Sequence, residues 1–194
     1  NFLFQPIGLK DVRVNEIMPD PNPVVGLPEN EYIELYNYSS KVFDLKGWTI
    51  SDGSTLAVLD HYYLLPKQYL LLCKEADAAD FVNFQPLMAL SSWPSLNNFG
   101  DSLILRDSSS VLVDSIHYSD NWYSDASKDD GGWSLSLIDP KDTCSATNLW
   151  QASLGPLGGT PGYQNSVFDT FYVRDISGVY QLMENDSATY SVLN

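Results

Sequence analysis

The 194-residue sequence predicts an all-β protein, a sandwich or a barrel built from short strands. Aromatic residues make up 13% of the chain, with twelve Tyr and five Trp, and such residues favour strands. Short apolar or alternating runs recur along the chain, each bounded by Gly, Pro, Asn, Asp or Ser. Only Lys74–Val82 has a composition that would allow a turn or two of helix. These features favour strands joined by turns over a helical fold.

The runs that we expect to form strands are Val12–Met18, Glu31–Tyr38, Gly47–Ser51, Gln68–Lys74, Ser102–Asp107, Val111–Tyr118 and Trp133–Ile138. A polar, serine-rich link joins the fifth and sixth runs, which predicts an antiparallel hairpin. The longest irregular stretches, Pro19–Asn30 and Ser119–Gly132, are rich in Pro, Asp, Ser and Gly and are expected to be surface loops. If the protein has a ligand site, we expect it to lie on loops of that size.

The second run alternates with a period of two, so that Ile33 and Leu35 share one face while Glu34 lies on the other. This is the pattern of a strand with one buried face. We expect six side chains to point into the core, namely Ile33, Leu35, Trp48, Leu103, Leu105 and Ile116.

The charge balance is strongly acidic. Ten Lys and Arg against 25 Asp and Glu give a net charge of −15, which would repel nucleic-acid phosphates and anionic membrane surfaces. No apolar run approaches the ~18 residues of a membrane span, so we expect neither nucleic acid as a partner nor membrane insertion of this segment. The chain opens at Asn1 without the features of a signal peptide, which indicates a piece of a longer or processed precursor.

The two cysteines, Cys73 and Cys144, cannot form a four-ligand zinc site by themselves. They are either one disulfide or two free thiols, and Cys73 follows an apolar run that could bury it.

Several segments, in one unbroken order from Val12 to Val167, resemble the lamin-tail domain known from nuclear lamins and secreted bacterial proteins. They are VNEIMPDPNP (Val14–Pro23), EYIELYN (Glu31–Asn37), DLKGWTISDG (Asp44–Gly53), PSLNNFGDSLILRD (Pro94–Asp107), VLVDSIHY (Val111–Tyr118), GGWSLSLIDP (Gly131–Pro140), NLWQAS (Asn148–Ser153) and GGTPGYQNSV (Gly158–Val167). The resemblance implies an immunoglobulin-like β-sandwich. It also implies an accessory module of an exported bacterial protein, placed outside the cell, on its surface or in the periplasm.

The resemblance divides the chain into residues 1–11 as a leader segment, 12–167 as the sandwich, and 168–194 as a C-terminal β extension or the start of a following domain. Within the extension, Thr170–Asp175 and Val179–Met183 have the pattern of a strand pair. Because a lone hairpin is marginal in water, we expect the extension and Phe2–Leu9 to pack together or to add to one edge of the sandwich, burying Phe171, Val173 and Tyr180.

The inventory of catalytic groups is poor. The turn G-x-S-x-G is absent, as are both Gly-rich phosphate-binding motifs. His61 and His117 lie in strand-like or turn-like surroundings and are expected to be structural. Glu31 and Glu34 are three apart, on opposite faces of one strand, and Asp129-Asp130 is more simply a solvated turn. We therefore expect no enzymatic activity; metal-assisted hydrolysis by loop carboxylates is the weakest alternative.

Two functions remain. The first is an interaction or architectural module that contacts a protein or another cell-envelope component. The second is a carbohydrate-binding module, because Trp122, Tyr123 and Trp133 flank an acidic loop that contains Asp125, Asp129 and Asp130. No cofactor is predicted. An irregular calcium site on those three Asp residues stays open, although the EF-hand spacing fails there.

Overall fold

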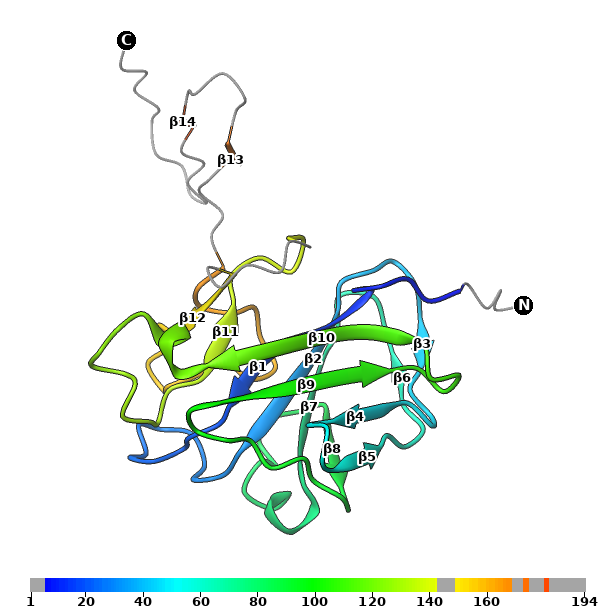
Figure 1. Ribbon diagram of the computed structural model, residues 1–194, viewed down its shortest axis with the longest axis horizontal. Helices are drawn as coiled ribbons and strands as arrows, with labels where there is room; N and C mark the ends of the chain where they lie inside the picture. The colour runs from blue at the N-terminus through cyan, green and yellow to red at the C-terminus, as the bar shows by residue number, and fades with distance from the viewer. Residues whose placement is uncertain (1–5, 143–148, 169–172, 175–179, 182–194) are drawn as a thin grey trace.

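The fold is a sandwich of two β-sheets (Figure 1), and the computed structural model describes residues 6–142, 149–168, 173–174 and 180–181. One sheet is built from β1 (Val12–Met18), β2 (Tyr32–Asn37), β7 (Tyr69–Lys74), β8 (Leu87–Leu90), β11 (Leu135–Leu137) and β12 (Trp150–Ala152). The other contains β4 (Thr49–Ser51), β5 (Leu56–Val58), β9 (Gly100–Arg106) and β10 (Leu112–Ser119). β3 (Phe43–Asp44) pairs separately with β6 (Tyr63–Leu64).

The strand order is β12–β11–β1–β2–β7–β8 in the six-stranded sheet and β10–β9–β4–β5 in the four-stranded sheet. β7 and β8 are parallel, and the other neighbouring pairs are antiparallel. Each of the seven expected runs contains a strand, and the expected β9–β10 hairpin is present. The all-β prediction and the immunoglobulin-like sandwich are confirmed.

Helical structure among the described residues consists of two short 3₁₀ turns, η1 (Glu75–Asp77) and η2 (Asp120–Tyr123), and of Leu149, which also has 3₁₀ geometry. The stretch Lys74–Val82, which allowed a turn or two of helix, contributes η1 followed by turns. Nothing in the described part of the chain forms a helix that is long and apolar enough to cross a membrane.

The main core lies between the two sheets. All six side chains predicted to point inward are buried, Trp48 among them at 4% exposure. Aromatic contacts extend this core, since the rings of Phe43 and Trp48 lie 5.7 Å apart. Burial of these large side chains is the principal stabilising contribution to the sandwich.

The prediction that the strand at Glu31–Tyr38 is buried on one face only is wrong. Tyr32 and Glu34, which point away from the main core, are both 0% exposed. A second, smaller core covers part of this outer face, with Tyr32 packed against Phe81 at a ring distance of 6.0 Å. Residues 154–168, here called the strap, cover the part that contains Glu34, as the hydrogen bonds below show. The alternating pattern missed this because it cannot reveal a second covering layer.

A β-bulge in each sheet sets the positions of the buried polar side chains. The register of β1 against β2 shifts between Val14 and Glu16, and that of β10 against β9 shifts between Leu112 and Asp114. Asp114 accepts hydrogen bonds from Arg13 Nε at 3.2 Å and from the Val14 amide at 2.9 Å. The bulge on β10 therefore attaches one sheet to the other. Burial raises the pKa of Asp114 even though Arg13 lies beside it.

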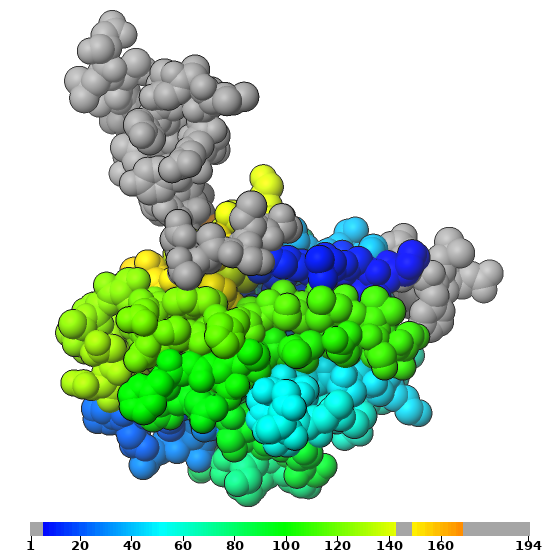
Figure 2. All heavy atoms as spheres, viewed as in Figure 1, coloured from blue at the N-terminus to red at the C-terminus, as the bar shows by residue number. Residues whose placement is uncertain are grey.

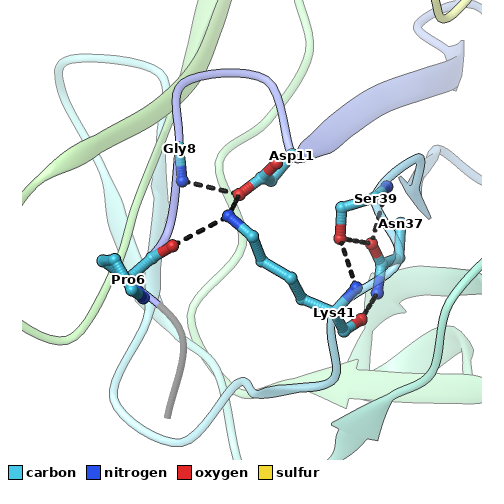
Figure 3. A network of polar contacts seen from close by, with 6 residues as sticks. All are labelled: Pro6, Gly8, Asp11, Asn37, Ser39 and Lys41. Carbon is cyan, nitrogen blue, oxygen red and sulfur yellow. Dashed lines mark hydrogen bonds and ion pairs between the residues drawn. The ribbon is translucent and has the colours of Figure 1, made fainter. Parts of the chain in front are cut away.

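The N-terminal segment is attached to the sandwich through a lysine (Figure 3). Lys41 Nζ donates to the Pro6 carbonyl at 2.8 Å and to Asp11 Oδ2 at 2.7 Å. Asp11 Oδ2 also accepts from the Gly8 amide at 2.6 Å, and Asn37 Nδ2 donates to the Lys41 carbonyl at 2.7 Å. Residues 6–11 of the expected leader are thus fixed against the ends of β1 and β2.

The C-terminal extension contains a strand pair, as expected, formed by β13 (Val173–Arg174) and β14 (Tyr180–Gln181). They are antiparallel, with Val173 opposite Gln181. Phe2, Phe4 and Phe171 lie outside the described residues, as do the side-chain surroundings of Val173 and Tyr180. The expected packing of the two chain ends therefore stays a prediction.

Candidate functional site

The aromatic residues of the predicted sugar site contribute mainly to packing. Trp122 is half-buried and stacks on Trp150, with ring centroids 5.8 Å apart. Tyr123 is 3% exposed and donates its hydroxyl to the Trp133 carbonyl at 3.1 Å. Burial of Tyr123 raises the pKa of its hydroxyl and leaves no ring face free for a sugar. The sequence of a single loop could not show that a residue as distant as Trp150 is the stacking partner.

The carboxylates of the same loop are on the surface. Asp125, Asp129 and Asp130 are all exposed. Asp125 Oδ1 accepts from the Ser127 hydroxyl at 2.7 Å and the Ser127 amide at 3.0 Å, and these bonds lower the pKa of Asp125. Among the described residues no three His, Cys, Asp or Glu side chains gather where they could hold a metal ion. Ligand and calcium binding by this loop stay predictions.

The two histidines each form one hydrogen bond on the surface. His61 Nδ1 lies 2.9 Å from Asp44 Oδ1, and His117 Nδ1 lies 2.7 Å from Ser102 Oγ. Ser102 and His117 are opposite each other on β9 and β10, so their contact is the ordinary cross-strand pair expected for His117. In the described part of the chain no carboxylate is hydrogen-bonded to His117 to complete a triad.

Cys73 lies in β7, fully buried in the smaller core. Burial raises the pKa of its thiol to about 11, so the thiolate is scarce near neutral pH. Cys144 lies outside the described residues, and the possible Cys73–Cys144 disulfide stays a prediction.

A buried carboxylate pair, which the sequence reasoning missed, lies on the outer face of the six-stranded sheet. The bulge in β1 places Glu16 directly opposite Glu34 on β2, and both are 0% exposed. Glu16 Oε1 accepts hydrogen bonds from the Tyr32 hydroxyl at 2.5 Å, the Ser134 hydroxyl at 2.7 Å and the Thr160 amide at 2.8 Å. Burial, and then the negative charge of Glu16, raise the pKa of Glu34 well above the ordinary value.

The strap supplies donors to both carboxylates. Thr160 Oγ1 donates to Glu16 Oε2 at 2.8 Å, and the Gly162 amide donates to Glu34 Oε2. Gly162 has a φ of +87°, a conformation that favours glycine. A Cβ on Gly159 would lie 2.4 Å from the Tyr32 hydroxyl and 2.6 Å from Glu16 Oε1. The Gly-Gly-Thr-Pro-Gly segment is therefore fitted to the carboxylate pair. Because the sheet and the strap supply hydrogen-bond donors to both carboxylates, the pair acts as a structural anchor.

No layer formed by the described residues covers the outer face of the four-stranded sheet, which is here called the open face (Figure 2). β9 and β10 in green and β4 and β5 in cyan form the surface that the figure shows. Alternation and strand register place ten side chains on it, namely Thr49, Ser51, Leu56, Val58, Ser102, Ile104, Arg106, Leu112, Ser115 and His117. Ser115, Ile104, Ser51 and Leu56 form one row across all four strands. None of the ten is a carboxylate, although the chain contains 25.

Together these features define an immunoglobulin-like sandwich with one open sheet face and no assembled catalytic group among the described residues. A comparison with protein-family models matches residues 6–120 to the lamin tail domain, and the chain belongs to that family. The lamin tail domain is a non-catalytic immunoglobulin-like module, consistent with an architectural or interaction role. A search of curated proteins finds no match to this chain. β11, β12 and the strap lie beyond the matched residues but complete the six-stranded sheet and its cover.

Proposed function

We propose that this domain is a non-catalytic interaction module of a larger exported or cell-surface bacterial protein, and that it binds a protein partner through the open face. The observation that carries the proposal is the contrast between the two sheets. The outer face of the six-stranded sheet is covered by the strap and the smaller core, whereas the open face presents its side chains to solvent.

The chemistry of the open face suits a protein surface. Leu56 and Val58 are 55% and 58% exposed on β5, the last strand of the sheet. Hydroxyl side chains alternate with apolar ones across the strands, and Arg106 and His117 are the cationic or titratable members. A carboxylate-free, partly apolar area on a chain of net charge −15 favours a partner with an apolar centre and a basic rim, because the surrounding carboxylates would repel an acidic one.

Site-specific photo-crosslinking in the producing organism tests this proposal. A photoreactive residue at Val58 or Ser115, both on the open face, should give one discrete protein adduct. The same residue at Val24, which is 49% exposed in the β1–β2 loop, is the matched control and should give none. Adducts from all three positions, or from none, would contradict the proposal.

The purified partner then allows a quantitative test. Val58→Glu places a charge on the exposed apolar part of the contact and should weaken binding by at least about tenfold, whereas Val24→Glu should leave the dissociation constant unchanged. The absence of catalysis is tested separately on a panel of hydrolase substrates with calcium or manganese. Turnover that disappears when Asp129 and Asp130 are replaced by Asn would contradict the non-catalytic assignment.

A further inference from the structure

A small cavity opens beside the strap, on the sheet opposite the open face. Its volume is about 220 Å³, and its walls come from β1, β2, β7 and β11 together with residues 139–141 and 164–168. Known ligand pockets span ~300–1,000 Å³ for drug-sized molecules, so a cavity of this size fits one small ring.

Three tyrosines form the aromatic wall of the cavity. Tyr36 on β2 and Tyr69 on β7 are cross-strand partners whose rings stack, with centroids 4.5 Å apart and planes at 22°. The Tyr38 ring lies 6.4 Å from that of Tyr36. All three are half-buried, and none of their hydroxyls has a hydrogen-bond partner among the described residues. Lys67 Nζ lies over one face of the Tyr38 ring, 4.1 Å from its centroid. The wall therefore presents the remaining ring surface together with hydroxyls that have no partner among the described residues.

The floor of the cavity is polar and fixed. Asn15 Nδ2 donates to Glu34 Oε1 at 2.8 Å and to Asn165 Oδ1 at 2.9 Å. Asn165 Nδ2 in turn donates to the carbonyls of Asn15 and Leu137, at 2.9 and 2.8 Å. Both Asn residues are nearly fully buried, at 2% and 5% exposure. Glu34 of the buried carboxylate pair thus holds the amide floor in place, which preorganises the cavity.

The rim carries polar groups that remain available. Gln164 and Lys141 are exposed, and neither side chain forms a hydrogen bond within the part of the chain that the structure describes. Asp139 lies beside Lys141 and accepts a bond from its amide at 2.8 Å. Opposite charges at the rim favour a neutral ligand rich in hydroxyl groups.

We propose that this cavity binds a single neutral pyranose ring, with the C–H face of the sugar against the tyrosines and its hydroxyls toward the rim and the free tyrosine hydroxyls. Aromatic rings pack well against apolar faces, while amide, carboxylate and ammonium groups pair with hydroxyls. The site is distinct from the loop at Trp122–Asp130 and lies on a different sheet from the open face. The sugar-binding proposal can therefore be refuted without refuting the protein-interaction proposal.

Nuclear magnetic resonance titration of the full chain tests the proposal, with glucose, galactose, mannose and N-acetylglucosamine as probes. We expect saturable changes in the ring signals of Tyr36, Tyr38 and Tyr69 with at least one sugar, and a dissociation constant on the order of millimolar for so small a ligand. No change with any probe at ten times that concentration, or changes confined to other residues, would overturn the proposal.

Variants make the test specific. Tyr36→Ala should weaken binding roughly tenfold. Gln164→Ala removes only an exposed rim group and should weaken binding without affecting folding, which protects the test if Tyr36→Ala is unstable. Tyr63→Ala is the matched control, because Tyr63 is 58% exposed on β6 and away from the cavity. Binding unchanged in Gln164→Ala and in any folded Tyr36→Ala, or nuclear Overhauser contacts that place residues 143–148 in the cavity, would refute the assignment.

Discussion

Replacing Glu16 separates the two contributions of the buried carboxylate pair, its charge and its hydrogen-bond geometry. In Glu16→Gln, the amide oxygen can occupy the place of Oε1 and still accept from Tyr32, Ser134 and the Thr160 amide. The new NH₂ group then faces Thr160 Oγ1, which can accept where it now donates. The substitution also removes the negative charge opposite Glu34. We expect the free energy of unfolding to change by less than about 1 kcal/mol at pH 7.

Glu16→Ala removes the acceptor altogether. Ser134 can turn its hydroxyl to Ser136 Oγ, which lies 3.3 Å away, and the hydroxyl of the half-buried Thr160 can turn to water, but the Tyr32 hydroxyl and the Thr160 amide are left without a partner. Each buried donor that loses its partner costs about 1–3 kcal/mol, so the two together should lower the free energy of unfolding by about 2–5 kcal/mol once the relief of charge repulsion is included.

Urea unfolding followed by the fluorescence of the five Trp residues measures both variants. Glu29→Ala is the control, because Glu29 is an exposed carboxylate in the β1–β2 loop and its loss should change stability by less than about 0.5 kcal/mol. Equal losses for Glu16→Gln and Glu16→Ala would show that the negative charge itself is required. A loss below about 1 kcal/mol for Glu16→Ala would show that water reaches the site.

Four further outcomes follow from the structure. The raised pKa of Glu34 means that the folded state binds its proton more tightly than the unfolded chain. The contribution of Glu34 to stability is therefore fully present below the ordinary pKa value of 4.5 and is lost as the pH rises through the folded-state pKa. Glu34→Gln should remove this part of the pH dependence of the melting temperature, and an unchanged slope would assign the dependence to other groups. Trp48→Ala should cost about 3–5 kcal/mol in urea unfolding, and a loss under about 1 kcal/mol would contradict its burial. Gly159→Ala should lower the melting temperature of the domain, because the added methyl group would clash with the carboxylate of Glu16. An unchanged melting curve would mean that the strap moves aside. Thiol labelling of the unfolded, unreduced protein should find either two reactive groups or none, and two would exclude the Cys73–Cys144 bond.

The sandwich could be predicted from sequence because its strands carry their own patterns. Leu103, Leu105 and Ile116 alternate with outward-facing residues on the β9–β10 hairpin, and the local turn fixes their pairing. Short strands such as β5 and β8 were not expected, since two to four residues are too few to show an alternation. Their positions depend on neighbouring strands that are distant in the chain.

The carboxylate pair could not be predicted, because it depends on the register between two strands. Glu31 is the only carboxylate that was considered as a neighbour of Glu34, and its position on the opposite face of the strand excluded it; the partner of Glu34 is Glu16 on β1. One signal was present: the buried apolar positions of β1 move from Val12 and Val14 to Ile17, a change of phase that indicates a bulge. Nothing in the sequence indicates that the strap donates hydrogen bonds to these carboxylates, since Thr160 lies 144 positions from Glu16.

The strap also determines when the folding of β1 and β2 can be completed during synthesis. Asn15 on β1 is held by Asn165, 150 positions later. At ~5–20 residues per second, a ribosome needs roughly 8–30 s to make the chain between them. For most of that interval β1 and β2 lack the donors that the strap supplies to Glu16 and Glu34. Completion of the domain is therefore a late event for its first two strands, because it depends on contacts of long sequence separation.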